Sequence, residues 1–154
     1  MSDFETLTFS RILPAQPDRV YRALTSAQDR MVWGPPGPDT VVLIEGQPDP
    51  APGVRETSRC GPRDNPYVTV LTDWVLMEPG ERVVYAETLM VEGAPLGVTL
   101  ATYEMAPDGT GTSLLLTLQI ASFIGAEMLS EFESGWTHAV DNLTRHLEGE
   151  MTCP

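Results

Sequence analysis

Alternating apolar and polar positions along most of the chain predict an antiparallel β-sheet. The pattern is clearest over 113–121, where every second residue from Leu114 to Ile120 is Leu or Ile. Leu115 breaks the alternation, so we expect its side chain on the outer face. The segment 54–59 contains few apolar residues and is predicted to be an edge strand. Further strands are predicted over 4–13, 41–44, 67–77, 82–91 and 96–105.

Helices are predicted between the first two strands and after the last one. Pro17 and Asp18 suit the first turn of a short helix, and a second short helix follows over 27–32. The longest helix covers about 126–147, and its apolar residues recur every three or four positions: Met128 or Leu129, Phe132, Trp136, Val140, Leu143 and Leu147. Such a stripe is typical of a helix that packs one face on a sheet.

The order of these elements predicts an α+β fold. The 154 residues fit a single domain over 1–154. A curved antiparallel sheet of about seven strands must bury its inner face, and only the last helix is long enough to cover it. We therefore expect a helix-grip fold, in which the sheet wraps around the C-terminal helix and two short helices lie between strands one and two. A cavity is expected between helix and sheet.

The charge balance excludes several classes of partner. Nine basic residues against 22 acidic ones give a formal charge of −13, which disfavours binding to nucleic acid or to an anionic membrane surface. All nine basic residues are arginine, so chemistry that depends on a lysine is excluded. The acidic start of the chain and the lack of a long apolar run predict neither a signal peptide nor a membrane span, and favour the cytoplasm.

Cysteine and histidine do not form a recognisable metal or catalytic motif. Cys60 and Cys153 lie far apart, and His138 and His146 have no metal-ligand spacing. We therefore expect no metal and no cofactor, and free thiols in a reducing compartment. Both histidines are interpreted as solvated helix residues.

Five segments, in order along nearly the whole chain, match one known fold family. They are 9–11 with 17–25, Trp33 to Gly37, Glu78 to Tyr85, the strand pair around Gly109, and Gly135-Trp136 with Ala139, Leu143 and Leu147. In these segments the chain resembles the SRPBCC superfamily, with its START or birch-pollen-allergen fold, and most of all the group named after activators of the heat-shock protein 90 ATPase. The resemblance implies a hydrophobic pocket, and relatives include ligand carriers, polyketide cyclases, resistance proteins and chaperone cofactors. A homodimer is compatible with the family.

Candidate chemistry is concentrated on two adjacent strands. If Val83 faces the helix, the two-residue period places Tyr85 and Glu87 on the same face, and Tyr103 shares it on the next strand. A carboxylate in an apolar cavity would have a raised pKa and could act as an acid or base. The alternative is a strand slip or bulge that leaves Glu87 solvated at the rim.

Two further features each allow two interpretations. Trp136 either stacks on a flat ligand or packs in the core, and Gly135 beside it would allow close approach of helix and sheet. The arginines at 55, 59 and 63 either attract an anionic ligand to a cavity mouth or lie on a solvated edge strand, paired with local acids.

The leading hypothesis is a small protein that binds a hydrophobic or aromatic small molecule in the cavity. The expected contacts are Trp74, Tyr85, Glu87, Tyr103, Phe132 and Trp136. One alternative is an enzyme of the cyclase or dehydratase type, with Glu87 or Tyr85 as the acid–base group. The other is a chaperone cofactor or dimerisation module that uses its outer surface. The residues leave open whether any reaction is catalysed, and favour binding.

Overall fold

The computed structural model describes residues 2–149 and shows a seven-stranded antiparallel sheet with the strand order β1-β7-β6-β5-β4-β3-β2. The strands are β1 (Asp3–Leu13), β2 (Thr40–Ile44), β3 (Arg55–Pro62), β4 (Val68–Glu78), β5 (Arg82–Val91), β6 (Ala94–Asp108) and β7 (Gly111–Ser122). Helices α1 (Pro17–Thr25) and α2 (Ala27–Trp33) connect β1 to β2, and α3 (Glu127–Leu147) follows β7. The predicted α+β helix-grip fold is confirmed.

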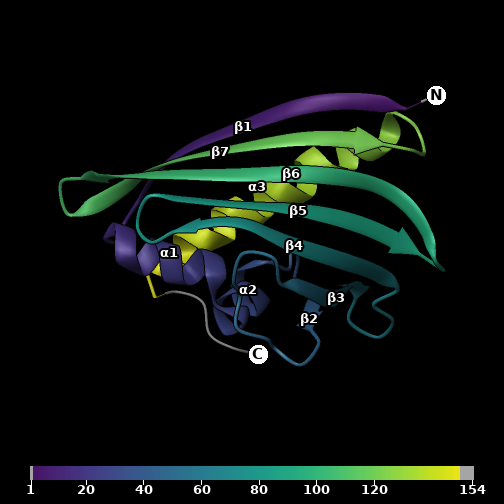
Figure 1. The fold of residues 1–154 in the computed structure, drawn as a ribbon, viewed down its shortest axis with the longest axis horizontal. Coiled ribbons are helices and arrows are strands. Elements are labelled where there is room, and N and C mark those ends of the chain that lie inside the picture. Colours follow the sequence, from purple (N-terminus) through teal and green to yellow (C-terminus); the bar gives the residue numbers. More distant parts are fainter. Residues whose placement is uncertain (1, 150–154) are drawn as a thin grey trace.

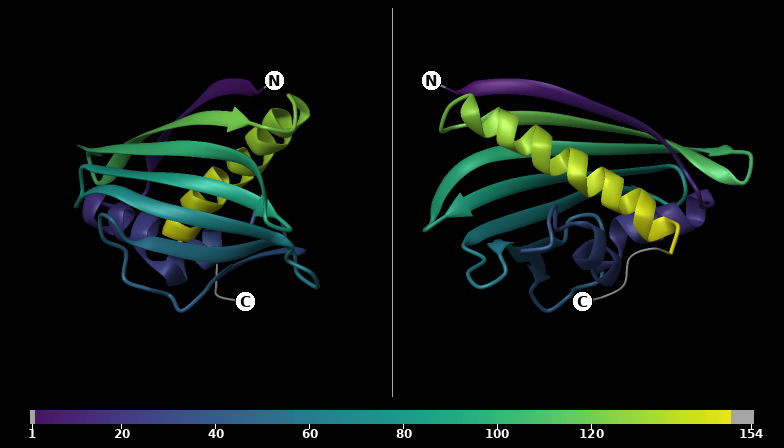
Figure 2. Two further views of the ribbon diagram at one scale, coloured as in Figure 1. Left: turned by 45° about the vertical axis from the view of Figure 1, so that its right-hand side comes forward. Right: turned by 180° about the vertical axis from the view of Figure 1, so that it is seen from behind.

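The sheet curls around α3, which crosses its concave face diagonally (Figures 1 and 2). Helices α1 and α2 lie beside the C-terminal half of α3 and close that end of the molecule (Figure 2). None of the helices within residues 2–149 is both long and apolar enough to span a membrane.

The alternation in β7 builds the centre of the core. Leu114, Leu116 and Leu118 are fully buried, whereas Leu115 is 41% exposed on the outer face, as predicted. Against the same strand, β1 pairs antiparallel with Leu7 opposite Leu118. The two-residue period therefore decides which side chains meet α3.

The prediction that 54–59 forms an edge strand was wrong. This segment belongs to β3, which lies between β4 and the short strand β2, so β2 forms that edge. The inner face of β3 carries Glu56 and Ser58, and both are buried. Few apolar residues are needed there because this face borders a cavity and an ion pair instead of the close-packed core.

The close approach of helix and sheet occurs at Gly97 and not at Gly135. A Cβ atom on Gly97 would lie 2.5 Å from the carbonyl oxygen of Ala121 and 2.7 Å from the Met128 methyl group. At Gly135 a Cβ atom would meet nothing within 4 Å. The helix thus touches the sheet at its first turn and stands clear of it near its middle, which leaves room for a cavity.

One histidine has a structural partner. His138 is exposed, as expected, but His146 is largely buried and bonds through Nε2 to the Asp29 carboxylate, which also accepts a 2.8 Å hydrogen bond from Arg19. The expectation that His146 is solvated was wrong, because α1 and α2 fold against the end of α3. Arg19 and the hydrogen bond from His146 hold the pKa of Asp29 below its usual value, although burial acts in the opposite direction and is the largest single effect.

Candidate functional site

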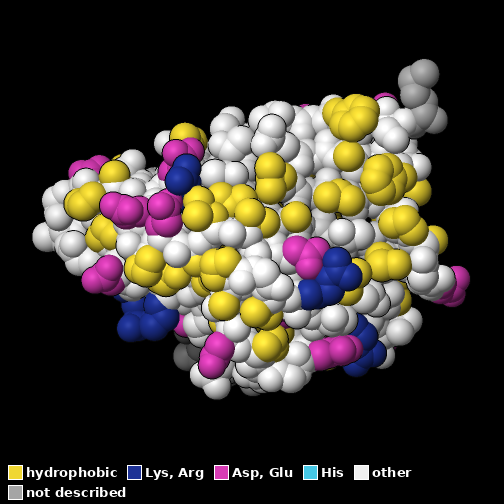
Figure 3. Space-filling view, in the orientation of Figure 1, with side chains coloured by type: hydrophobic (Ala, Val, Ile, Leu, Met, Phe, Trp, Pro, Cys, Tyr) yellow, Lys and Arg dark blue, Asp and Glu magenta, His cyan; other side chains and the backbone are white. Residues whose placement is uncertain are grey.

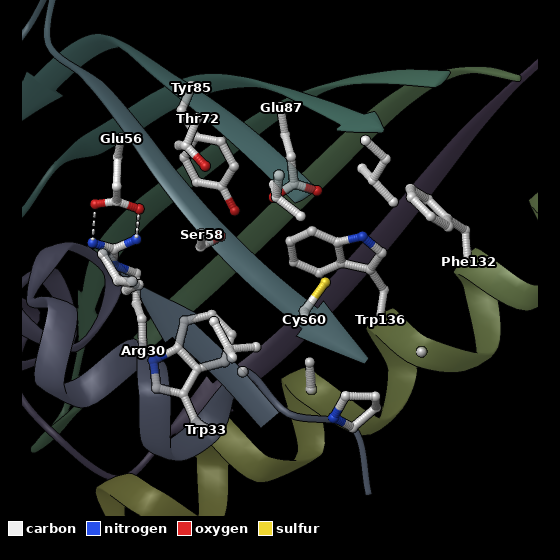
Figure 4. A pocket seen from close by; sticks show the side chains of 18 of the residues that line it. Arg30, Trp33, Glu56, Ser58, Cys60, Thr72, Tyr85, Glu87, Phe132 and Trp136 are labelled. Carbon is white, nitrogen blue, oxygen red and sulfur yellow. Dashed lines mark hydrogen bonds and ion pairs between the residues drawn. The ribbon is translucent and has the colours of Figure 1, made fainter. Parts of the chain in front are cut away.

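A cavity of about 250 Å³ opens between α3 and the half of the sheet formed by β2 to β5 (Figure 4). Its walls are formed by α2, the loop after it, the inner faces of these four strands and the middle of α3. The volume is close to the lower end of the range for small-molecule pockets, roughly 300–1,000 Å³. It lies where Gly135 leaves α3 clear of the sheet.

Three aromatic side chains form the helical side of the cavity. Phe132 and Trp136 reach it from α3, and Trp33 from the end of α2 (Figure 4). Phe132 and Trp136 stand where the apolar stripe of the helix predicted them. Trp33 was not among the predicted contacts, although it forms part of a segment that resembles the SRPBCC superfamily. Its indole N–H donates a 2.8 Å hydrogen bond to the carbonyl of Ala23, which fixes the ring.

Most polar groups of the cavity lie on its sheet side, among apolar side chains of the same strands. Ser58, Thr72, Tyr85 and Glu87 point into it from β3, β4 and β5 (Figure 4). Thr72 and Glu87 lie opposite each other in the β4–β5 register. Cys60 follows Ser58 on the same face of β3, and burial raises the pKa of its thiol to about 11, with a further contribution from the negative charge of Glu87.

Glu87 lines the cavity on the face of β5 that the two-residue period predicted, in regular register with β6, and its side chain is half-buried. Within residues 2–149 its carboxylate has neither a hydrogen-bond nor an ion-pair partner. Burial raises its pKa from 4.5 to about 7; Arg30 lowers the value and Glu56 raises it, both more weakly than burial. A carboxyl group with this pKa exists in both protonation states near neutral pH.

A buried ion pair borders the polar side. Arg30 on α2 meets Glu56 on β3 in a bidentate arrangement with both nitrogen–oxygen distances at 2.7 Å (Figure 4). Neither residue was among the predicted site residues. The inward position of Glu56 could have been predicted from the two-residue period of the strand. If Arg55 and Arg59 share the outer face, Glu56 and Ser58 must share the inner one.

Two predicted contacts, Trp74 and Tyr103, do not line the cavity. Both are almost completely buried behind it. The Arg30 guanidinium covers the Trp74 ring at 4.9 Å, and the ring packs edge-on against Tyr85. The hydroxyl groups of Tyr103 and Tyr85 lie 2.9 Å apart. Strand parity placed Tyr103 on the correct face, and Trp74 was expected there as a contact, but neighbouring side chains from α2 and β5 cover both residues.

Burial also affects the tyrosine pair. It is the largest cause that raises the pKa of Tyr85 and of Tyr103 well above the usual value, so both hydroxyl groups are protonated at neutral pH. Tyr85, which lines the cavity, can therefore offer a hydrogen bond to a ligand but is a poor base.

The two arginines of β3, and Arg63 just after it, make their contacts away from the cavity. Arg55 pairs with Asp73 in a bidentate bridge at the surface, Arg59 lies 4.0 Å from Glu45, and the Arg63 side chain donates to the carbonyl of Pro38. These contacts favour the interpretation as a solvated strand paired with local acids. Within residues 2–149, no cluster of His, Cys, Asp or Glu is arranged to hold a metal ion. Cys60 is a free thiol, and Cys153 lies outside the described residues.

A family model described as "polyketide cyclase / dehydrase and lipid transport" matches residues 5–151. The chain belongs to this family. The match also supports the SRPBCC superfamily, in agreement with the resemblance noted in the sequence. Among curated proteins, none matches the chain.

Solved structures of similar fold cover almost the whole chain. A protein of Chromobacterium violaceum is 22% identical, with 93% of this chain and 96% of that one covered and a TM-score of 0.80. A protein of Rhizobium loti is 26% identical, with 94% and 97% covered and a TM-score of 0.78. DynU16, a protein of the dynemicin biosynthetic locus, is 15% identical; 93% of this chain and 47% of that one are covered, with a TM-score of 0.66. These likenesses show the fold.

Proposed function

We propose that this family member binds a compact, largely apolar and aromatic small molecule in the cavity between α3 and the sheet. One observation carries the proposal: Trp33, Phe132 and Trp136 border one open space, and Gly135 leaves that space unfilled. Flat aromatic ligands gain affinity from ring stacking as well as from burial of apolar area. On the opposite wall, Tyr85 and Thr72 supply polar groups that orient a ligand.

The family supports the same proposal. Its description names cyclisation or dehydration of polyketides and transport of lipids, and both require a protein that takes up hydrophobic molecules. DynU16, with the same fold, comes from a biosynthetic locus. A cavity of about 250 Å³ favours a compact ligand over a long acyl chain.

Native mass spectrometry of protein purified gently from its own host tests the proposal. We expect a co-purifying small molecule, which is lost when Trp136→Ala removes the stacking surface or Gly135→Leu fills the cavity. Leu115→Ala is the matched control, because this side chain lies on the outer face of the sheet. A folded protein that carries no molecule and shows no thermal shift with an aromatic and lipid library would overturn the proposal.

A second candidate function is catalysis of the cyclase or dehydratase type. The observation in its favour is Glu87, whose pKa of about 7 is suited to general acid–base work. Tyr85 would supply a hydrogen bond to the substrate. Conversion of a bound neutral molecule by the native protein, lost in Glu87→Gln with binding retained, would establish an enzyme, and equal turnover in this variant would exclude Glu87 as the acid–base group.

The third candidate is a protein-interaction module, in keeping with the heat-shock protein 90 activator group and a cytoplasmic location. Apolar side chains gather on the outer face of the sheet near the start of β1 (Figure 3), where Phe4 is 75% exposed and Leu100 is 38% exposed beside it in a shallow groove. The mass in solution of native protein and of Phe4→Ser tests for a homodimer. Stimulation of the chaperone ATPase tests membership of the activator group.

A further inference from the structure

Among residues 2–149, the charged groups on the sheet side of the cavity carry one negative charge in excess. The positive charge of Arg30 is taken up by the bidentate contact with Glu56. Glu87 shares the wall, but its carboxylate has no partner within residues 2–149. When ionised, these three groups sum to a single negative charge inside a cavity with aromatic walls.

No second cation of the described chain borders the cavity. The titratable groups around Glu87 are Arg30 from α2, Glu56 and Cys60 from β3, Tyr85 from its own strand, Tyr103 from β6 and the exposed Glu131 from α3. Apart from Arg30, each of them is neutral or negative when the cavity is at neutral pH. An ionised Glu87 therefore lacks a counter-ion that the described residues could supply.

The opposite wall suits a cation as well as an apolar ring. A positive charge is attracted to the faces of aromatic rings, most of all tryptophan, and the gain rises when water is excluded. Trp33 and Trp136 both border this cavity. The net charge of −13 adds a negative potential that attracts cations from solution.

We infer that the ligand of this cavity is a protonated arylalkylamine, in which the amine stands on an alkyl carbon attached to an aromatic ring. Its ammonium group donates hydrogen bonds to Glu87 while the ring packs against Trp136. The inference rests on the proposed function and names the class of ligand. The bound ammonium group supplies the counter-ion that Glu87 lacks, so the complex has no excess negative charge at this wall. A hydrogen bond between two ionised partners is also stronger than one between neutral groups.

The test compares two probes that differ in one group. Binding of 2-naphthylmethylamine and of 2-naphthylmethanol is measured by isothermal titration calorimetry on the full chain. At about pH 8 we expect the amine to bind at least about tenfold more tightly, since a charged hydrogen bond contributes on the order of tenfold or more. As the pH falls to about 5.5, this preference should shrink, because Glu87 becomes protonated while the amine keeps its charge.

Variants assign the preference to Glu87. Glu87→Gln should reduce the ratio of the two affinities at about pH 8 by about tenfold and abolish its dependence on pH, whereas Glu104→Gln, an exposed residue of β6, should leave both unchanged. The pH profile of the unmodified protein needs no variant, so the inference stays testable even if Glu87→Gln folds poorly. Equal affinity of both probes at about pH 8 would overturn the amine and leave the cavity as a binding site; failure of both probes to bind would count against the cavity itself and the inference with it.

Discussion

Arg30 and Glu56 form a bidentate ion pair that joins α2 to β3, with side chains that are 13% and 1% exposed. The pair fixes the helix that carries Trp33 against the strand that carries Ser58 and Cys60. The ion pair is therefore one of the contacts that hold two walls of the cavity in position. Because Arg30 also covers Trp74, loss of the pair disturbs the core behind the cavity as well.

Loss of either partner is expected to be costly. Arg30→Met leaves the Glu56 carboxylate buried and unpaired, so the free energy of unfolding should fall by about 3–5 kcal/mol. Urea unfolding followed by circular dichroism measures the change. The double variant Arg30→Met with Glu56→Leu should recover most of the loss, because it leaves no isolated charge.

Arg55→Met is the matched control for this prediction. It breaks the bidentate pair with Asp73 on the outer face of the same strand, where water solvates both groups. The unfolding midpoint should hardly change. Equal losses in Arg30→Met and Arg55→Met would contradict the importance of burial for the inner pair.

Glu87 should make stability depend on pH. Its pKa is about 7 in the folded state and 4.5 as a reference, so the folded chain holds the proton more tightly. The stability from this group is fully present below pH 4.5 and is lost as the pH rises to about 7. At higher pH, Glu87→Gln should exceed the native protein in free energy of unfolding by up to roughly 3 kcal/mol. Parallel stability curves for the two proteins from pH 4 to 8 would contradict the raised pKa, and Glu104→Gln serves as the control.

Replacement of Gly135 and of Gly97 by alanine should change the free energy of unfolding in opposite directions. Gly135→Ala adds a methyl group in open space and a better helix former, so it should raise the free energy of unfolding by about 0.5–1 kcal/mol. Gly97→Ala forces a methyl group against the Ala121 carbonyl and Met128, and should lower it by about 1–3 kcal/mol. Urea titrations of both variants measure these changes. A loss of stability in Gly135→Ala would contradict the open space at Gly135 and show that α3 packs against the sheet there.

The alkylation rate of Cys60, which lines the cavity, measures the environment of its thiol. Its thiol pKa of about 11, against the usual 9.0, lowers the thiolate fraction near neutral pH. In a Cys153→Ser background, alkylation by iodoacetamide should be roughly 100-fold slower than for an unfolded peptide. Glu87→Gln should speed the reaction, since it removes a negative charge that raises this pKa. A rate equal to that of the peptide would contradict the burial of the thiol.

The sequence determined the elements and which face of each strand turns inward. Period two in β7 and the three-and-four spacing in α3 follow from local geometry, so the positions of Phe132 and Trp136 could be predicted without knowledge of any contact. The same parity placed Tyr85 and Glu87 on the cavity side. Tyr103 was assigned to the correct face for the same reason.

The tertiary structure alone decided which inward residues meet empty space. Trp74 and Tyr103 are covered by Arg30 and Tyr85, side chains that come from other elements. Arg30 and Glu56 are 26 positions apart, and no local periodicity signals their pairing. The sheet contacts the first turn of α3 at Gly97, whereas α3 stands clear of the sheet at Gly135. The curvature of the sheet therefore fixes where the cavity lies. The spacing of residues within a strand or helix determines which way a side chain points. The distance between two elements results from packing of the whole chain.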